Sequence, residues 1–395
     1  MNAAFSGELR LLLEELCCEL CRLRHVAEDH VAPGDVATLR EVKLVTPGAF
    51  ADIVVTRPGR PAYFVEIKYG LSLEETIRSI GRKYAINHRP TCNQLVVVVH
   101  NLNPAVLKER LRHCVCPSLE IEIWDEPRLL ADIKRYYGME ITGLAEANMA
   151  MLHRSILQAD WRRLFDEDYY EVLASALLWH FNTWTLKRLR DDLHLPPAEM
   201  FQPGTYPDIA IVMGDISSFS AYVRDTPDKR VVQQVLTAFY SQSRHAVHQY
   251  GGMFYQFVGD EVIGLFGFPD RKAGYVEDAV NCAKALLDIG ASTSEHWERR
   301  IDRVQDKHGL HAGIAIGELG LLPLRPFARS HIGFIGDSLN VSARLMADAG
   351  PGEIVVSNAF YHSLQEELQA EFVENQPLVA KNVGTLRSWR RLAEH

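Results

Sequence analysis

Apolar and polar positions over the first part of the chain follow both helical and strand periods. Leucine recurs at steps of three and four residues near the N-terminus, which predicts an amphipathic helix. Short runs rich in valine and isoleucine, separated by glycine and proline, predict buried strands. The expected elements are a helix over 8–26, strands over 51–55 and 62–67, a helix over 73–87, and strands over 95–100 and 121–124. This order predicts a small α/β domain over residues 1–140.

A helical segment and a proline-rich stretch come next. Residues 145–195 are rich in Leu, Ala, Trp and Arg and have a helix-like pattern. The sequence LPPAEMFQPGTYP, at 195–207, contains four prolines and one glycine, which predicts a linker. We therefore assign residues 141–206 to a helical connector with its linker, and residues 207–395 to a second domain.

The pattern of the second domain predicts an α+β fold. Apolar strands alternate with amphipathic stretches, and a Gly-Asp pair joins two strands into a hairpin. The helices are expected on one face of a mixed sheet. The expected elements are a strand over 208–215, a helix over 230–250, a hairpin over 253–267, a helix over 276–289, a strand over 309–320, a helix over 337–349, and two strands over 378–392.

Composition and charge narrow the class of protein. The chain has 395 residues, 47% of them apolar, which suits two or three domains with buried cores. The net charge of −9 argues against a protein that mainly wraps nucleic acid, although a local basic groove stays open. The seven cysteines lack zinc-site spacing and suit a reducing compartment. Without a long apolar run or a signal-peptide pattern, we expect a cytoplasmic protein that does not bind membranes.

Two aspartates are candidates for metal chemistry. Asp215 ends an apolar strand, and Asp260 lies in the turn of the predicted hairpin. Two carboxylates together with phosphate oxygens suit Mg²⁺ or Mn²⁺, which prefer oxygen ligands. The alternative for each residue alone is structural, since aspartate is common in hairpin turns and at helix N-termini.

Six sequence blocks occur in order through the second domain. They are GDISSFS (214–220), GGMFYQFVGDEVIGLFG (251–267), GLHAGIAIGELG (309–320), GDSLNVSARL (336–345), PGEIVVS (351–357) and KNVGTLRSW (381–389). Together they resemble the class III adenylate/guanylate cyclase catalytic domain over roughly 190 residues. The resemblance implies an α+β cyclase domain that converts a nucleoside triphosphate to its 3′,5′-cyclic monophosphate and pyrophosphate.

The resemblance also implies roles for particular residues. Asp215 and Asp260 match the pair that holds two divalent metal ions, Mg²⁺ or Mn²⁺, with the backbone carbonyl of Ile216 as a further ligand. Asn340 and Arg344 lie four residues apart on one helix face and match the residues that orient the ribose and meet phosphate charge. Lys381 is a candidate for binding the triphosphate, or is an exposed strand lysine. In this family the metal aspartates of one subunit face the Asn and Arg of the other, which implies a homodimer with two composite sites.

The positions that read the base differ from those of the purine cyclases. Gln256 stands where adenylate cyclases have lysine, and Gly333 stands where they have Asp or Thr; the guanylate pair, Glu and Cys, is also absent. An amide at position 256 both donates and accepts, which suits uracil or cytosine. Phe254 shares the predicted strand face of Gln256 at a two-residue step, where it either fills space beside a small base or packs in the core.

This pattern resembles the bacterial pyrimidine cyclases of anti-phage signalling, which make cyclic UMP or cyclic CMP for a separately encoded effector. The substrate implied is UTP, or less favoured CTP. Two alternatives remain. One is an adenylate or guanylate cyclase with an atypical base pocket, and the other is a nuclease-like or binding protein whose cyclase domain is a relic.

The N-terminal domain carries a weaker motif. Asp52, Glu66 and Lys68 form D-x13-E-I-K on two predicted strands. The motif resembles the PD-(D/E)xK nuclease core, in which two carboxylates bind a metal ion and the lysine activates water. Three basic residues on the following helix would face phosphates: Arg78, Arg82 and Lys83. An inactive nuclease-like fold used as a sensor or dimerisation module, or a chance match, are the alternatives, and nucleic-acid binding stays open.

Overall fold

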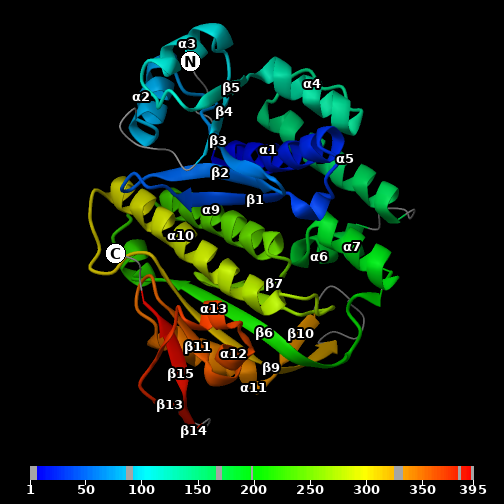
Figure 1. Ribbon diagram of the computed structural model, residues 1–395, viewed down its shortest axis with the longest axis vertical. Coiled ribbons are helices and arrows are strands. Elements are labelled where there is room, and N and C mark those ends of the chain that lie inside the picture. The colour runs from blue at the N-terminus through cyan, green and yellow to red at the C-terminus, as the bar shows by residue number, and fades with distance from the viewer. Residues whose placement is uncertain are drawn as a thin grey trace. The chain divides into compact units, whose positions relative to one another are not determined.

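The computed structural model describes residues 7–85, 92–165, 171–196, 199–323, 332–380 and 384–392 (Figure 1). The chain divides into two units, Met1–Ala159 and Asp160–His395, each with its own sheet and hydrophobic core. Within these described segments, no helix is long and apolar enough to cross a membrane.

The N-terminal unit is built on a five-stranded sheet in the order β1-β2-β3-β4-β5. The first three strands are antiparallel, and β3, β4 and β5 are parallel. Helices cover both faces: α1 and α4 pack on one, α2 and α3 on the other, which confirms the predicted α/β character. The bounds are α1 Gly7–Glu28, β1 Ala37–Lys43, β2 Phe50–Arg57, β3 Arg60–Ile67, α2 Leu73–Lys83, β4 Gln94–Val98, α3 Pro104–Arg112, β5 Glu120–Trp124, α4 Glu126–Tyr137 and α5 Glu146–Phe165.

Strand β1 was not predicted, because its sequence ATLREVK breaks the apolar alternation with three charged residues. Two of them, Arg40 and Glu41, are nevertheless buried. Arg40 forms an ion pair with the buried Glu14 of α1. The strand is therefore held in place by charge pairing as well as by its apolar side chains.

The C-terminal unit contains an eight-stranded sheet in the order β12-β15-β11-β9-β6-β8-β7, with β10 also paired to β9. The two longest strands, β6 and β9, are antiparallel neighbours at its centre. This mixed sheet confirms the predicted α+β class. The strands are β6 Gly204–Ile216, β7 Met253–Val258, β8 Glu261–Phe266, β9 Leu310–Pro323, β10 Ile332–Ile335, β11 Ile354–Ser357, β12 Val373–Glu374 and β15 Ser388–Arg391, with a separate hairpin of β13 Leu378–Ala380 and β14 Gly384–Leu386.

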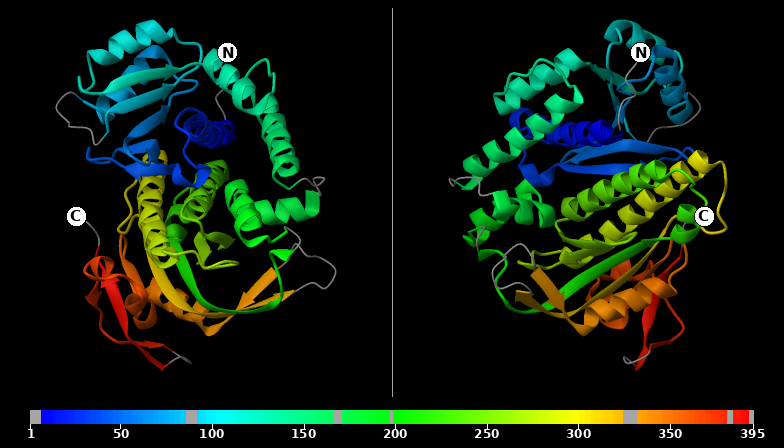
Figure 2. Two further views of the ribbon diagram at one scale, coloured as in Figure 1. Left: turned by 45° about the vertical axis from the view of Figure 1, so that its right-hand side comes forward. Right: turned by 180° about the vertical axis from the view of Figure 1, so that it is seen from behind.

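Helices cover both faces of this sheet, not one as predicted. The long helices α9 and α10 lie side by side on one face (Figure 2). Side chains of α6 and α7 pack against the other face, on strands β6, β7 and β8, and α11 packs on the same face over β6, β9 and β11. The prediction was wrong for two reasons: α6 and α7 lie in the segment assigned to a connector, and the predicted helix α11 packs on the face opposite α9 and α10. The helices are α6 Glu171–His180, α7 Thr183–Leu193, α8 Phe219–Arg224, α9 Lys229–Gln249, α10 Tyr275–Ile301, α11 Asp337–Asp348, α12 Asn358–Ser363 and α13 Glu366–Gln369.

Several predicted boundaries are wrong, among them those of β6 and α10, and the described part of 378–392 holds three strands, β13, β14 and β15, where two were predicted. Strand β6 begins at Gly204, inside the proline-rich stretch, because Gly204 and Thr205 pair with β9. Helix α10 continues past the predicted end at residue 289 to Ile301. Gly290, which resembles a helix stop, is instead the point of closest approach to β9: a Cβ there would lie 2.2 Å from the Cβ of Leu310.

Candidate active site

Two aspartates meet where β6 ends and the β7–β8 hairpin turns. Asp215 is the penultimate residue of β6 and lies opposite His311 of β9. Asp260 follows Gly259 in the turn, and Gly259 has a φ of 68°, which glycine adopts without strain. The carboxyl groups of the two aspartates are close enough to interact, and the backbone amide of Ile216 is also close to Asp260. The structure thus brings together the three residues predicted to hold metal.

Negative charge at this pair is poorly compensated. Burial, together with the hydrogen bond and negative charge of Asp215, raises the pKa of Asp260 to about 8. The Oδ2 atom of Asp260 is buried, and no described residue hydrogen-bonds it. Two adjacent carboxylates with an unsatisfied oxygen are a donor set that suits a hard divalent cation such as Mg²⁺ or Mn²⁺.

The described side chains do not by themselves form a complete set of ligands for such a cation. Among the residues that the structure describes, no group of three or more His, Cys, Asp or Glu side chains is arranged to hold a metal ion. Main-chain, water and phosphate oxygens would complete the coordination, which is the usual pattern for Mg²⁺ bound with a nucleotide.

Three residues around the pair were missed by the sequence reasoning. His311 Nε2 lies 3.9 Å from Asp215 Oδ2, and His311 Nδ1 is 3.1 Å from the Ser217 hydroxyl. Burial lowers the pKa of His311, so the ring is neutral at pH 7 and supplies no compensating charge. Burial and the charge of Asp215 raise the pKa of Glu261, the residue after Asp260. A single histidine at the start of a strand gave no signal of this contact.

Helix α11 carries Asn340 and Arg344 on one exposed face, as their four-residue spacing predicted. The opposite face is seated on the sheet through Ser342, whose hydroxyl donates to the carbonyls of Ile211 at 3.1 Å and Gly313 at 3.0 Å. A Cβ at Gly313 would lie 2.3 Å from the backbone nitrogen of Met346. The absence of a side chain at 313 therefore lets α11 approach β9 closely.

The two predicted base-reading positions lie on strands that a tyrosine connects. Gln256 is an exposed residue of β7, and Gly333 is a buried residue of β10. Between them, the hydroxyl of Tyr255 accepts a hydrogen bond of 3.1 Å from the backbone amide of Phe334. The rings of Tyr255 and Phe334 also meet edge to face at 5.4 Å. Tyr255 was not predicted to have a role here.

The predicted position of Phe254 beside Gln256 is wrong. A β-bulge lies between the two residues: Phe254 pairs with Gly264, whereas Gln256 pairs with the adjacent Ile263. Cross-strand partners share a face, so the two side chains point to opposite faces of the sheet. Phe254 is fully buried in the core beneath α9 and α10. The apolar and polar pattern of the sequence does not reveal this bulge, so the two-residue spacing wrongly predicted a shared face.

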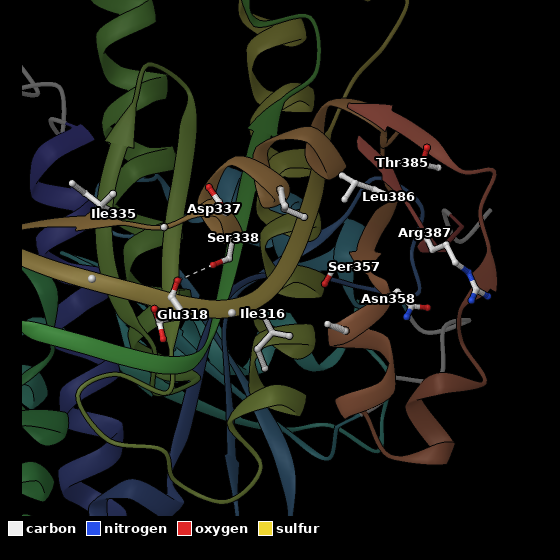
Figure 3. Close-up of a pocket in the computed structure, with 15 residues that line it drawn as sticks. Ile316, Glu318, Ile335, Asp337, Ser338, Ser357, Asn358, Thr385, Leu386 and Arg387 are labelled. Carbon is white, nitrogen blue, oxygen red and sulfur yellow. Dashed lines mark hydrogen bonds between the residues drawn. The ribbon is translucent and has the colours of Figure 1, made fainter. Parts of the chain in front are cut away.

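A cavity of about 760 Å³ lies along the N-terminal end of α11 (Figure 3). One wall is formed by Glu318 of β9 with Asp337 and Ser338, and the facing wall by Asn358 and Arg387. The Ser338 hydroxyl donates to the Glu318 carbonyl at 3.2 Å. Of the predicted site residues, none lines this cavity within the described segments; Lys381 lies outside them.

The N-terminal motif residues also come together, on β2 and β3. Lys68 Nζ lies 3.0 Å from Asp52 Oδ2 and 2.6 Å from Glu66 Oε2. Lys83, expected to face phosphates, contacts the same carboxylates, at 3.3 Å from Asp52 Oδ1 and 2.7 Å from Glu66 Oε2. The Tyr84 hydroxyl donates to Glu66 Oε1 at 2.7 Å.

These carboxylates are buried and fully compensated. Arg10 adds a third cation, with Nη2 at 3.5 Å from Asp52 Oδ1, and the Ile67 amide donates to Asp52 Oδ2 at 2.7 Å. Burial alone would raise the pKa of Asp52. The charges of Lys68, Lys83 and Arg10 outweigh this effect and hold that pKa well below its usual range. Cations of the protein itself thus occupy the place that a metal ion would need.

Residues 201–389 match the family described as the adenylate and guanylate cyclase catalytic domain. This match covers just under half of the chain and lies within the C-terminal unit, where the mixed sheet and the paired aspartates are also found. The family match begins after α6 and α7 and does not include the N-terminal unit.

Several known proteins are similar to parts of the chain. Uncharacterized proteins of Mycobacterium tuberculosis and Mycobacterium bovis are 25% identical to it over 232 residues, which cover 55% of this chain and 54% of each relative. The chain therefore spans about half the length of the curated relatives it matches. Among solved structures, the guanylyl cyclase Cya2 has 19% identity and a TM-score of 0.43 over 48% of this chain and 94% of its own. The adenylyl cyclase CyaB of P. aeruginosa has 18% identity and a TM-score of 0.41 over 49% of this chain and 97% of its own.

Proposed function

We propose that this protein converts a pyrimidine nucleoside triphosphate, UTP in preference to CTP, to its 3′,5′-cyclic monophosphate and pyrophosphate. The observation that carries the proposal is the pair of neighbouring aspartates, Asp215 and Asp260, with a buried, unsatisfied oxygen on Asp260, in the segment that matches the cyclase family. A partly buried carboxyl group whose pKa is raised by a neighbouring carboxylate is suited to exchanging its proton for a divalent cation.

The proposed roles follow from the chemistry of each side chain. Asp215 and Asp260, with the Ile216 carbonyl, would hold two Mg²⁺ or Mn²⁺ ions, which activate the ribose 3′-hydroxyl and neutralise the leaving pyrophosphate. Asn340 would orient the ribose, and Arg344 would stabilise charge on the α-phosphoryl group with two parallel N–H donors. Lys381 would contact the triphosphate.

We infer that the active form is a homodimer. The exposed face of α11 holds Asn340 and Arg344 without a described ion pair for Arg344, and no described lysine or arginine forms an ion pair with Asp215 or Asp260. Arg344 of the partner subunit would supply positive charge to the nucleotide held at Asp215 and Asp260. Each dimer would then contain two composite sites.

The choice of a pyrimidine rests on the two base-reading positions. Gln256 is exposed and offers an amide that can donate to O4 of uracil or accept from N4 of cytosine. Gly333 offers no side chain to read the exocyclic group of a purine. The alternative is a purine cyclase with an atypical pocket, and the exposed Gln256 favours the pyrimidine because it carries no cation for a purine ring nitrogen.

A product assay tests the proposal. Purified protein is incubated with ATP, GTP, CTP and UTP in turn, with Mn²⁺, and the product is identified by mass. We expect cyclic UMP to form fastest. Faster conversion of ATP or GTP than of both pyrimidine nucleotides would replace this proposal with the purine cyclase, and no product from any of the four would favour a relic domain.

The product would act as a second messenger in anti-phage defence, read by a separately encoded effector; the support for this is the resemblance to the pyrimidine cyclases alone. For the N-terminal unit, we propose a non-catalytic module in place of a nuclease. Its carboxylates, Asp52 and Glu66, are already paired with Lys68 and Lys83, which leaves little negative charge to attract a metal ion.

A further inference from the structure

The last turn of α6 contacts the strand that carries the base-reading Gln256 (Figure 1). His180, the final residue of α6, is 7% exposed, and its Nδ1 lies 2.7 Å from the carbonyl oxygen of Phe254. Because a carbonyl only accepts, the hydrogen must be on Nδ1 of the ring. Burial lowers the pKa of His180 to about 4, so this neutral donor persists across the physiological range.

A second set of contacts fixes the same end of α6. The Trp179 ring meets the rings of Phe254 at 5.3 Å and Phe257 at 6.4 Å, both edge to face. The Arg244 guanidinium of α9 lies 5.6 Å from the Trp179 ring and donates to the Trp179 carbonyl at 2.9 Å. Helix α6 is thus anchored to β7 and to α9 within one unit.

The contact falls at the bulge that orients the base-reading side chain. Pairing of β7 with β8 changes register between Phe254 and Gln256, so the backbone at Phe254 determines the face on which Gln256 emerges. Bulges re-aim a neighbouring side chain and weaken the local ladder. A buried hydrogen bond from outside the sheet, at the first residue of this bulge, would hold it in one conformation.

We propose that α6 is a working part of the base pocket and that His180 is a positioning residue, which sets nucleotide preference by holding the Phe254 carbonyl and thereby the orientation of Gln256. The inference rests on the proposed function, since it concerns the same pocket. It assigns a role to a segment that lies before the matched cyclase domain, which begins at residue 201.

The test compares two substitutions in the full chain. His180→Leu removes the donor, and His180→Asn keeps an N–H at the position of Nδ1. We expect His180→Leu to lower the UTP-over-ATP ratio of kcat/KM about tenfold, mainly through KM, because a small displacement of a binding group is enough for such a loss. We expect His180→Asn to retain most of the ratio. Hydrogen exchange of the β7–β8 amides should quicken in His180→Leu and stay near the wild-type rate in His180→Asn.

Val355→Ala is the matched control for a general loss of stability. Val355 is fully buried in β11, three strands away from β8 in the sheet order, so its variant should lower Tm while keeping the ratio. An unchanged ratio in His180→Leu, or an equal loss in both His180 variants, overturns the inference. If the wild-type protein makes no cyclic nucleotide, the proposed function fails, and calorimetric affinities of wild type and His180→Leu for the four triphosphates still decide the inference by the same criterion.

Discussion

Each unit of the chain holds a pair of acidic residues on neighbouring parts of its sheet, and the two pairs are electrostatic opposites. Asp52 and Glu66 are surrounded by Lys68, Lys83 and Arg10, and the pKa of Asp52 is lowered. Asp215 and Asp260 form no ion pair with a lysine or arginine of the described residues, their neighbour His311 is neutral, and the pKa of Asp260 is raised. Acidic residues alone do not mark a metal site. A metal site is marked by negative charge that the protein's own lysines and arginines do not neutralise.

The largest expected effect is on catalysis. Asp260→Asn and Asp215→Asn should each lower cyclase activity by at least about a thousandfold, since each removes a charge that would hold the ions stabilising the transition state. Cyclic nucleotide formation at saturating Mn²⁺ measures this, and circular dichroism should show an intact fold. Asp302→Asn is the control: Asp302 has a φ of 51° at the C-terminus of α10, a conformation that asparagine also tolerates. More than a tenth of wild-type activity in both variants would overturn the metal assignment.

The next effect tests whether Arg344 of the partner subunit supplies positive charge at the site of Asp215 and Asp260. A chain with Asp260→Ala and a chain with Arg344→Ala should each be inactive, and mixing them should restore about a quarter of wild-type activity. Half of the dimers would then be mixed, each with one intact site out of two. Activity after co-refolding measures this. If mixed dimers form, as seen by native mass spectrometry, and remain inactive, both sets of residues serve the same chain and the comparison must be redrawn.

A third effect tests the charge compensation of Asp52 and Glu66 in the N-terminal unit. Lys83→Met should destabilise the N-terminal unit by about 3 kcal/mol, because it removes one of the two lysines that pair with the buried Asp52 and Glu66. Urea unfolding measures the loss. Lys272→Met removes an ion pair with Asp278 in which both side chains are partly exposed, and should cost less than about 1 kcal/mol. We also expect Lys83→Met to bind Mn²⁺ more tightly at the N-terminal unit; equal stability in the two variants would contradict the balanced-charge interpretation.

The smallest expected effect is on the pH dependence of stability. Since the folded pKa of Asp260 is about 8, above that of an unfolded aspartate, the folded state holds a proton that it loses as pH rises. The metal-free protein should therefore lose stability between about pH 4 and pH 8. Asp260→Asn should reduce this slope and raise Tm by a few degrees at pH 8. Asp52 changes the stability in the opposite direction. Its contribution to the free energy of unfolding is complete above the pKa of an unfolded aspartate and is lost as pH falls further. Thermal scans of the wild type and Asp260→Asn, without metal, measure the difference.

The sequence was most informative where local pattern and chemistry coincide. The Gly-Asp turn placed Asp260 correctly, and four-residue spacing placed Asn340 and Arg344 on one face. It failed where tertiary contacts decide: no pattern reveals the bulge that sends Phe254 into the core. Lys83 was expected to face phosphates but pairs with Glu66, because spacing along a helix does not say which side meets a buried carboxylate. His311 was missed because its partner, Asp215, lies on a strand remote in sequence.

The close packing of α11 on β9 at Gly313 has a consequence for redesigning the nucleotide preference. Any side chain at position 313 would push against the backbone at Met346 and Ser342, and so shift the helix that presents Asn340 and Arg344. A mutagenesis library that seeks a new substrate should therefore keep Gly313 and Ser342 invariant and vary positions 256 and 333. Inactive variants in such a screen would then reflect changed base recognition and not a displacement of α11.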